Sequence, residues 1–454
     1  MSVFRTLLLV SKSAMLEEAR VLYDALEQDW PGGATIVVAG DLTTDSVIVD
    51  SLHGANFAMD SPKPAIFYRS QIWMRIARYG LLRTFWTVIA IVKRERNASR
   101  LLTQIKPDAL IVFEDRAIDP EMTWLKVATS RKLPSIMIRY ASSSIESDVW
   151  TRHERTPYSL DHGCFAWARR LFARRHPFHA LKTDTGRHIF FSLWDSLALA
   201  LCRMTNTYPW IAGGGMTNLV ALQGKIDYDE AIRHTNMPRR FCITGQPTWD
   251  RLAAQRHSLP AKSAEDTDSC IAKAGCQCVL VCALPQWGEH LQMSWDRHLK
   301  LIEQLFVILH GLRCKIILSL HPKARTEDYR PMAEKYKLLI ADKPLSEILP
   351  QADVFIASWS STLRWAAMLG IPSINLDWAT QRYSLFAELR SLLLSENPSD
   401  LEPQLSAIIR QDSARKHLGQ RLKEESVAFG TIDGFAVQRI TSLIESLIKN
   451  HTHE

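Results

Sequence analysis

The chain has 454 residues, far more than one typical domain needs, so a single-domain protein is excluded. Apolar residues make up 46% and charged residues 23%, a globular balance that excludes collagen-like and intrinsically disordered chains. The net charge is only +7, from 55 basic and 48 acidic side chains. This surplus is too dilute for a protein whose whole surface binds nucleic acid.

Cysteine usage and the amino-terminal sequence predict a cytoplasmic location. The eight cysteines follow no regular spacing, and the first residues lack the pattern of a signal peptide. Two apolar runs, at residues 79–92 and 189–202, contain Arg83 and Asp195 respectively and are shorter than the roughly 20 residues of a membrane span. The first run is followed by four charged residues. It suits either an amphipathic helix at a lipid surface or a buried helix.

The first half of the chain alternates apolar, strand-like runs with helical periodicity. Strands are predicted over residues 6–10, 35–39, 109–113, 135–139 and 218–222, followed by a short one at 241–243, and a helix is predicted over residues 14–27. Continuous apolar strands of this kind indicate a parallel sheet that is covered on both faces. Residues 142–210, rich in Arg, His and aromatic side chains, show no clear strand period.

After a polar stretch at residues 259–275, which predicts a loop or insertion, the alternation starts again. Strands are predicted over residues 278–283, 315–320, 353–357 and 372–376, helices over 290–310 and 361–369, and a mostly helical tail over 401–449. Two successive series of strand and helix predict an α/β protein with two Rossmann-like domains that face each other across a cleft.

Loops at the carboxyl ends of two strands in the second half are suited to anions. The first loop, after the strand at 315–320, carries His321, Lys323 and Arg325, which can donate several hydrogen bonds to a phosphate. The second, after the strand at 353–357, carries four hydroxyl side chains: Ser358, Ser360, Ser361 and Thr362. Such hydroxyls also act as plain helix caps. We predict that the two loops lie on neighbouring strands and bind one phosphate group together.

A series of short motifs follows the same order as in a known enzyme class. They are Gly245-Gln246-Pro247-Thr248-Trp249-Asp250, His321-Pro322-Lys323, Ala352-Asp353-Val354, Ser360-Ser361-Thr362 and Gly370-Ile371-Pro372. In order and spacing they resemble the donor domain of GT-B glycosyltransferases of bacterial envelope polysaccharides. The resemblance covers residues 215–380. It includes sialyltransferase-like and Kdo-transferase-like enzymes, glycerophosphotransferases of teichoic acid synthesis, and the non-hydrolysing UDP-sugar 2-epimerases.

This resemblance implies a set of residues that bind a nucleotide-sugar donor. They are His321, Lys323, Arg325, Ser358, Ser360, Ser361, Thr362, Gly245, Gln246, Gln286, Lys343 and Leu345. Many such enzymes carry a glutamate after the Ser motif that holds the ribose hydroxyls, whereas this chain reads Leu363-Arg364-Trp365. The departure weakens a UDP-sugar donor and favours a CMP-sugar. The Gly-Gly and paired glutamates typical of the epimerases are also missing.

An inverting sugar transfer needs a general base near the acceptor hydroxyl, and a carboxylate at a strand end of the first domain can supply it. Glu114 and Asp115, directly after the strand at 109–113, are the first choice, and Glu146 and Asp148 are the second. These acids equally suit a solvated loop or a helix cap. Lys12 and Ser13, after the first strand, are placed near the donor phosphates or the acceptor, or only at the cap of the next helix. The triplet Gly213-Gly214-Gly215 suits a hinge-side turn or the close approach of a sugar.

Residues 151–190 carry eight basic and three acidic side chains, interleaved with aromatic residues. This segment suits an anionic membrane surface or a charged, lipid-linked glycan; a solvated basic face is the alternative. Neither the histidines of this segment nor Cys276, Cys278 and Cys282 follow a metal-site spacing, so we predict no metal and no cofactor. No nucleic-acid-binding module is recognisable.

We therefore predict a cytoplasmic, metal-independent and inverting GT-B glycosyltransferase, peripheral on the inner face of the membrane. It moves a sugar from a CMP- or UDP-linked donor to a surface-polysaccharide or lipid-linked glycan acceptor. Residues 1–240 form the acceptor domain, 241–400 the donor domain, and 401–454 helices that pack back across the domains. The alternatives are a UDP-sugar 2-epimerase, a CDP-polyol phosphotransferase, and a non-catalytic nucleotide-sugar-binding subunit.

Overall fold

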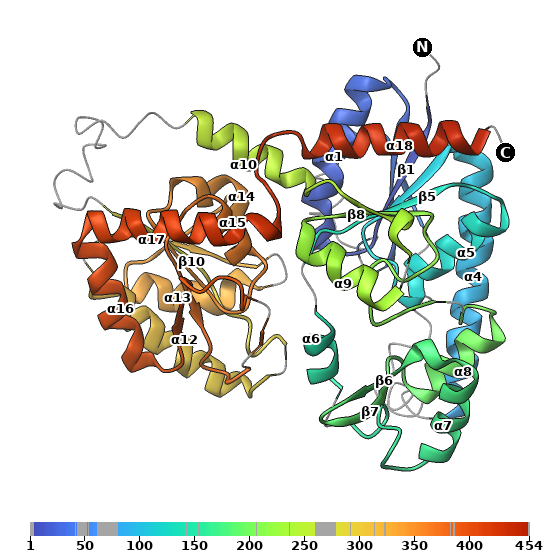
Figure 1. Cartoon of the computed structure of the whole chain (residues 1–454), viewed down its shortest axis with the longest axis horizontal. Coiled ribbons are helices and arrows are strands. Elements are labelled where there is room, and N and C mark those ends of the chain that lie inside the picture. Colours follow the sequence, from blue (N-terminus) through green and yellow to red (C-terminus); the bar gives the residue numbers. More distant parts are fainter. Residues whose placement is uncertain are drawn as a thin grey trace. The chain divides into compact units, whose positions relative to one another are not determined.

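The computed structural model describes residues 4–40, 42, 52, 54–60, 80–141, 144–152, 155–205, 207–235, 237–258, 278–290, 292–312, 314–321, 324–381, 383–384 and 386–452. The chain forms two compact units, each with its own sheet (Figure 1). The first unit combines Met1–Gln246 with Val437–Glu454, and the second is Pro247–Ala436. The division therefore follows Gln246 instead of residue 240, and the tail predicted over 401–454 is divided between the two units. The predicted loop at 259–275 lies outside the described residues.

The first unit contains a seven-stranded parallel sheet in the order β3-β2-β1-β4-β5-β8-β9. Its strands are β1 (Thr6–Val10), β2 (Ala34–Val38), β3 (Phe57–Met59), β4 (Ala109–Val112), β5 (Ser135–Ile138), β8 (Leu219–Leu222) and β9 (Phe241–Ile243). All five residues of β1 are buried, which accounts for its unbroken apolar run. β9 pairs with β8, so the short strand at 241–243 completes the first sheet.

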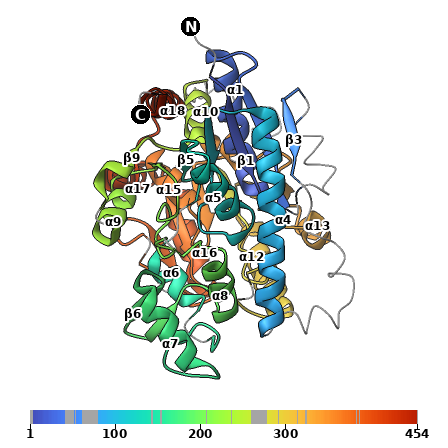
Figure 2. The same cartoon turned by 90° about the vertical axis from the view of Figure 1, so that its right-hand side faces the viewer.

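Helices cover both faces of this sheet. They are α1 (Leu16–Asp29), α4 (Leu81–Ile105), α5 (Thr123–Ser130), α9 (Lys225–Thr235) and α18 (Ala436–Thr452), with a π-helical turn at Ile118–Met122. Alternate residues of a strand point to opposite faces. Leu8 accordingly packs in one core with α1 and α18, whereas Leu7 and Leu9 pack in the other with α4 and α5. Figure 2 shows α18 and α4 on opposite sides of the sheet.

A segment inserted between β5 and β8 contains several elements that the sequence did not reveal, as it also did not reveal β3 and, in the second unit, β15 (Leu393–Ser395). The inserted elements are α6 (Ile145–Trp150), α7 (Ala166–Arg175), α8 (Leu193–Leu201) and an antiparallel hairpin of β6 (Ala180–Thr183) and β7 (Gly186–Ile189). The hairpin strands have four residues each and most of their side chains are half-buried or exposed. Their burial pattern therefore leaves no clean apolar period in the sequence.

The second unit contains a six-stranded parallel sheet in the order β12-β11-β10-β13-β14-β15. Its strands are β10 (Val279–Ala283), β11 (Lys315–Ser319), β12 (Leu339–Ile340), β13 (Val354–Ala357), β14 (Ser373–Leu376) and β15 (Leu393–Ser395). Its helices are α10 (Pro247–Ser258), α12 (Trp295–His310), α13 (Thr326–Lys335), α14 (Leu345–Ile348), α15 (Thr362–Met368), α16 (Pro398–Arg410) and α17 (Asp412–Glu425). The prediction of two Rossmann-like domains is confirmed.

In both sheets the strand that comes first in the chain lies in the interior, as the third strand of the order. The chain leaves β1 towards β2 and β3, then returns to the other side of β1 with β4, and the second sheet repeats this around β10. The strand order therefore reverses between β1 and β4 and between β10 and β13. In open α/β sheets, ligands bind beyond the carboxyl ends of the strands at such switch points. No helix in the described ranges is long and apolar enough to cross a bilayer.

Candidate functional site

The switch point of the first unit brings together the residues that follow β1 and β4. Lys12, after β1, donates a hydrogen bond from Nζ to Glu114 Oε2 over 3.0 Å, and Glu114 follows β4. The register of β1 on β4 pairs Leu9 with Val112, so both strands end at the same edge of the sheet. Lys12 and Glu114, which the sequence predicts separately as site residues, are thus brought together by the topology. Ser13 begins the short helix that precedes α1.

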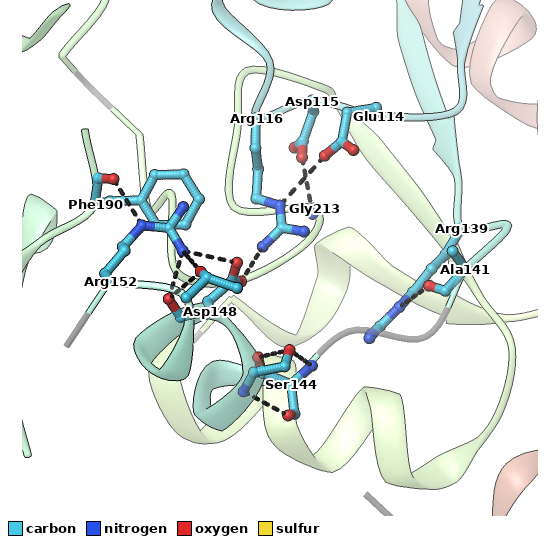
Figure 3. Close-up of polar contacts among 12 residues, drawn as sticks. Glu114, Asp115, Arg116, Arg139, Ala141, Ser144, Asp148, Arg152, Phe190 and Gly213 are labelled. Carbon is cyan, nitrogen blue, oxygen red and sulfur yellow. Dashed lines mark hydrogen bonds and ion pairs between the residues drawn. The ribbon is translucent and has the colours of Figure 1, made fainter. Parts of the chain in front are cut away.

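Glu114 lies between two cations and forms an ion pair with each. Arg116 approaches Glu114 Oε1 from Nε over 3.3 Å, and its Nη1 lies 2.7 Å from Asp148 Oδ2 (Figure 3). Burial opposes the charged form of Glu114, but Arg116 and Lys12 outweigh it and lower its pKa. A carboxylate with a depressed pKa is a weak proton acceptor. Glu114 is therefore better suited to holding Lys12 in place than to acting as a base.

Asp115 has a structural role that its position in the sequence does not reveal. Its side chain is buried, and its two carboxylate oxygens accept hydrogen bonds from the backbone N–H of Gly213 (3.0 Å) and Gly215 (2.6 Å). Burial raises its pKa despite these two bonds. Both oxygens are engaged, so Asp115 fastens the 213–215 turn to the end of β4. This geometry corrects the prediction of Asp115 as the general base.

Glu121, which the sequence did not single out, lies in the same cluster. It belongs to the π-helical turn Ile118–Met122, its side chain is 1% exposed, and Ser11 Oγ donates to its Oε1. Its other oxygen, Oε2, is buried and has no hydrogen-bond partner. Burial raises the pKa of Glu121 to about 7, against the opposing influence of Ser11 and Lys12. Only the fold brings this position beside Ser11.

Lys12 interacts electrostatically with both Glu114 and Glu121. Burial lowers its pKa, but Glu114, Tyr140 and Glu121 outweigh this and raise it, so Lys12 stays protonated. Burial also raises the pKa of Tyr140 to about 12. The switch point thus holds one cationic amine, one ionised carboxylate and one carboxyl that titrates near neutrality.

The second-choice acids lie on α6, at the edge of this cluster. Asp148 pairs with Arg116 and also with Arg152 (3.1 Å), whose guanidinium lies 4.0 Å from the centre of the Phe190 ring (Figure 3). Glu146 is exposed in the first turn of α6. Asp148 therefore belongs to the ion-pair chain that starts at Lys12.

The switch point of the second unit joins the loops that follow β10 and β13. Trp287, after β10, donates from Nε1 to Ser358 Oγ over 2.9 Å. His321 follows β11, which lies on the far side of β10. The prediction that the His321 and Ser358–Thr362 loops lie on neighbouring strands is therefore wrong, because the first strand of the unit separates them. Both loops follow the carboxyl ends of their strands at the same edge of the sheet, and strands β11 and β13 are two strand spacings, about 10 Å, apart. Lys323 lies outside the described residues.

The hydroxyl loop itself is held rigidly by Trp359. This residue has a left-handed backbone (φ 45°), its N–H donates to Asn375 Oδ1 (2.8 Å), and its indole N–H donates to Asp377 Oδ1 (2.9 Å). Its ring stacks on that of Phe386, with 5.9 Å between the ring centres and an angle of 9° between the ring planes.

Two of the predicted hydroxyls in this loop bond each other. Ser360 Oγ and Thr362 Oγ1 are 2.8 Å apart, and the Thr362 N–H donates to Ser360 Oγ over 3.3 Å. Ser360 thus accepts from the first N–H of α15, whereas Ser361, the N-cap residue, is half-buried and makes no capping bond with its side chain.

Of the remaining predicted donor residues, Gln286 lies in the β10 loop, directly before Trp287. Its Oε1 is 3.0 Å from His290 Nε2, and its Nε2 is buried without a hydrogen-bond partner among the described residues. The others lie elsewhere in the unit: Arg325 is 76% exposed and 4.0 Å from Asp328, Lys343 is exposed, and Leu345 begins α14.

Gly245 and Gln246 do not belong to the second sheet, where they were predicted to bind the donor. The Gly245 N–H donates to the carbonyl of Leu222 in the first sheet (3.2 Å). Gln246 is buried, accepts from Gln223 (2.8 Å) and donates to Glu18 of α1. Its amide therefore stabilises the first unit, and the prediction of Gln246 as a donor ligand is corrected.

Comparison with known proteins supports the architecture. No family model and no curated protein matches the chain. Among solved structures, it is similar to UDP-GlcNAc 2-epimerase from Neisseria meningitidis bound to UDP-GlcNAc, at 10% identity and a TM-score of 0.54, over 98% of this chain and 100% of that one. It is similar to S. aureus MnaA with UDP, at 13% identity and a TM-score of 0.54, over 98% of this chain and 97% of that one. It is also similar to the wall teichoic acid polymerase TagF with CDPG, at 13% identity and a TM-score of 0.55, over 98% of this chain and 89% of that one.

The fold is GT-B-like. At these identities the likeness shows the fold alone, but it extends over nearly the whole chain and both units. Within the described ranges, no group of three or more His, Cys, Asp or Glu side chains is placed to hold a metal ion. At the first switch point, Glu114 is paired with Lys12 and Arg116, and Asp115 accepts from two backbone N–H groups.

Proposed function

We propose that this GT-B-like protein is a transferase that moves the sugar of a nucleotide-linked donor to a surface-polysaccharide or lipid-linked glycan acceptor and releases the nucleotide. The observation that carries the proposal is the cluster of Ser11, Lys12, Glu114 and Glu121 at the switch point of the first unit. It combines a buried acid–base group with a fixed cation, at the place where a Rossmann-like sheet receives its ligand. Similar solved structures hold UDP, UDP-GlcNAc or CDPG, which supports a nucleotide-linked donor.

In this proposal Glu121 is the general base and Ser11 connects it to the acceptor. With a pKa of about 7, Glu121 is about half ionised at neutral pH and can accept a proton without a large energetic penalty. Ser11 is half-buried and already donates to it, so a proton from the acceptor hydroxyl passes to Ser11 as the Ser11 proton passes to Glu121. Lys12, held by Glu114, supplies positive charge to the anionic reactants.

The donor is assigned to the second unit, around His321 and the Ser358–Thr362 loop. The His321 imidazole, the Arg325 guanidinium and the loop N–H groups are of the type that stabilises the charge of a departing nucleotide phosphate. The inverting outcome, the metal-free mechanism and the cytoplasmic location remain predictions of the sequence. Of the nucleotides, CMP is favoured by the missing carboxylate on α15, where Arg364 is buried.

Thermal shift with CMP, CDP, UDP and GDP tests the donor assignment. A nucleotide that binds only the folded protein raises the melting temperature in proportion to the logarithm of its concentration. We expect one nucleotide to stabilise the protein and His321→Ala to remove that shift. His417→Ala, at an exposed histidine of α17, is the matched control and should keep it. If none of the four shifts the melting temperature, the proposed donor class is wrong.

A 2-epimerase is the second candidate, because the epimerase structures cover nearly all of both chains. Incubation with UDP-GlcNAc alone separates the two reactions, since an epimerase needs no acceptor. Conversion to the 2-epimer without acceptor would replace the transferase proposal. A CDP-polyol phosphotransferase would instead consume CDP-glycerol in the presence of an acceptor. A non-catalytic subunit would keep its biological role in the Glu121→Gln variant.

A further inference from the structure

One end of the first unit exposes apolar side chains on α4 that its own core does not need. Exposed fractions are 72% for Leu81, 56% for Phe85 and 37% for Val92. Spacings of four and seven residues place these three on one stripe of the helix. The same stripe continues into exposed Lys93 and Arg96. The outward face of α4 is therefore apolar at its beginning and basic further along.

The neighbouring helix α7 repeats this arrangement. Trp167 is 64% exposed and Leu171 is 62% exposed, and a spacing of four residues places them on one face. Arg174 and Arg175 follow on the same side and are exposed as well. Large apolar residues joined to arginines in this order are typical of helices that lie in a lipid headgroup region.

Helix α8 lies between α4 and α7 and contacts both. Asp195 of α8 accepts two 2.7 Å hydrogen bonds from Arg83 of α4, and the Trp194 carbonyl accepts from Thr84 over 2.9 Å. On its other side, the Trp194 ring lies 5.4 Å from Phe165, directly before α7. Figures 1 and 2 both show α7, α8 and one end of α4 side by side. We call the exposed residues of the three helices the α4–α7 face: Leu81, Leu82, Phe85, Val92, Trp167, Leu171, Arg174, Arg175 and Leu201.

We propose that the α4–α7 face docks on an anionic lipid bilayer. Transfer of the Phe, Trp and Leu side chains at its surface into the boundary of the acyl chains is favourable. The adjacent arginines and Lys93 are attracted to the lipid phosphates. The acids of α4, α7 and α8 do not oppose this charge, because Glu95 pairs with Lys126 and Asp195 with Arg83. This inference goes beyond the proposed reaction and does not depend on it.

A second copy of the chain fits this face less well. A two-fold dimer brings the same patch against itself. The arginines of both copies, Arg174 and Arg175, would then be brought into one interface with no acid of α4, α7 or α8 free to pair with them, and concentrated like charge in an interface is unfavourable. An anionic surface satisfies both the apolar residues and the arginines.

Co-sedimentation of the full chain with lipid vesicles tests the proposal. We expect binding to vesicles of phosphatidylcholine with phosphatidylglycerol, little binding to phosphatidylcholine alone, and weaker binding at high salt. Trp167→Ala with Leu171→Ala should lower the partition coefficient about tenfold or more, since two large apolar side chains no longer enter the lipid. Arg174→Glu with Arg175→Glu should reduce binding only to the anionic vesicles.

Matched controls lie in the second unit. Val307→Ala with Leu339→Ala removes two apolar side chains of similar exposure, and Lys300→Glu with Arg330→Glu reverses two exposed charges. Both control pairs should bind vesicles like the unaltered protein, and circular dichroism should show that every variant is folded. Absence of binding to anionic vesicles, equal binding by all variants, or a dimer that the α4–α7 variants dissociate would each overturn the proposal.

Discussion

Two glutamates that follow β4, Glu114 and Glu121, have pKa values that their surroundings shift in opposite directions. Glu114 meets Lys12 and Arg116, and these cations lower its pKa. Glu121 is enclosed by the π-helical turn, where burial raises its pKa to about 7. Titratable groups whose environments separate their pKa values are a common arrangement for acid–base chemistry. The division of roles between a base and a positioning residue follows from this difference.

Replacing the base should change the pH profile of transfer. In the unaltered protein we expect kcat to rise as Glu121 ionises through about pH 7, and Glu121→Gln should lower kcat by roughly 10²–10⁴-fold and remove that rise. Initial rates across a pH series measure both effects. Glu146→Gln, at the exposed second-choice acid, is the control. If Glu146→Gln lost activity and Glu121→Gln kept it, the base would be misassigned.

The same carboxyl should affect stability with a defined sign. Its pKa in the folded protein is raised from 4.5 to about 7, so the folded state binds the proton more tightly than the unfolded chain. The free energy of unfolding should therefore fall as pH rises between these values, by up to about 3 kcal/mol. Glu121→Gln should lack this decline in denaturant titrations. A decline of the same size in the variant would contradict the raised pKa.

The 213–215 turn offers a prediction about packing. A Cβ added at Gly215 would lie 2.4 Å from Asp115 Oδ2 and 2.7 Å from its backbone oxygen. Gly215→Ala should therefore lower the free energy of unfolding by roughly 1–3 kcal/mol, the usual range for overpacking. At Gly311 the nearest atom to a Cβ is 3.5 Å away, so Gly311→Ala is the control. Equal stability of the two variants would show that the turn is not tightly fixed.

Among the elements, strands were the most predictable and strand order the least. Each buried strand gives its own apolar run, so β1, β4 and β5 were located to within a residue. Which strands are neighbours depends on how the chain returns across the sheet. The sequence does not show that β10 separates β11 from β13, and it does not show that the turn after β4 buries Glu121 beside Ser11. Candidate residues next to strand ends were found, but their partners were not.

Helix α18 closes one core of the first unit, although it comes almost 200 residues after the last strand of that sheet, counted from Ile243 to Ala436. Ile440 and Ile444 are fully buried in that core beside Leu8 and Leu22. Ile440→Ala or Ile444→Ala should each lower the free energy of unfolding by about 2–5 kcal/mol. Gln438→Ala, on the exposed side of the helix, should change it little. Denaturant titration measures all three, and a small effect at both isoleucines would show that α18 is not part of the core.

At the scale of the whole molecule, the two units differ in continuity. The second unit is one uninterrupted stretch, Pro247–Ala436, with its own core, whereas the first needs Val437–Glu454 to complete it. A fragment of residues 247–436 should therefore fold and melt cooperatively by circular dichroism, whereas residues 1–246 should not. The outcome opposite to this, a folded 1–246 fragment, would show that α18 is dispensable.

The late position of α18 also affects how the protein folds during synthesis. The second unit can leave the ribosome and fold while the first still lacks one layer over its sheet. Until residues 437–454 emerge, apolar side chains of β1 and α1 stay accessible to chaperones and proteases. Truncated chains that end before residue 437 should therefore keep one face of the first sheet uncovered. Cellular quality control can recognise and degrade such chains.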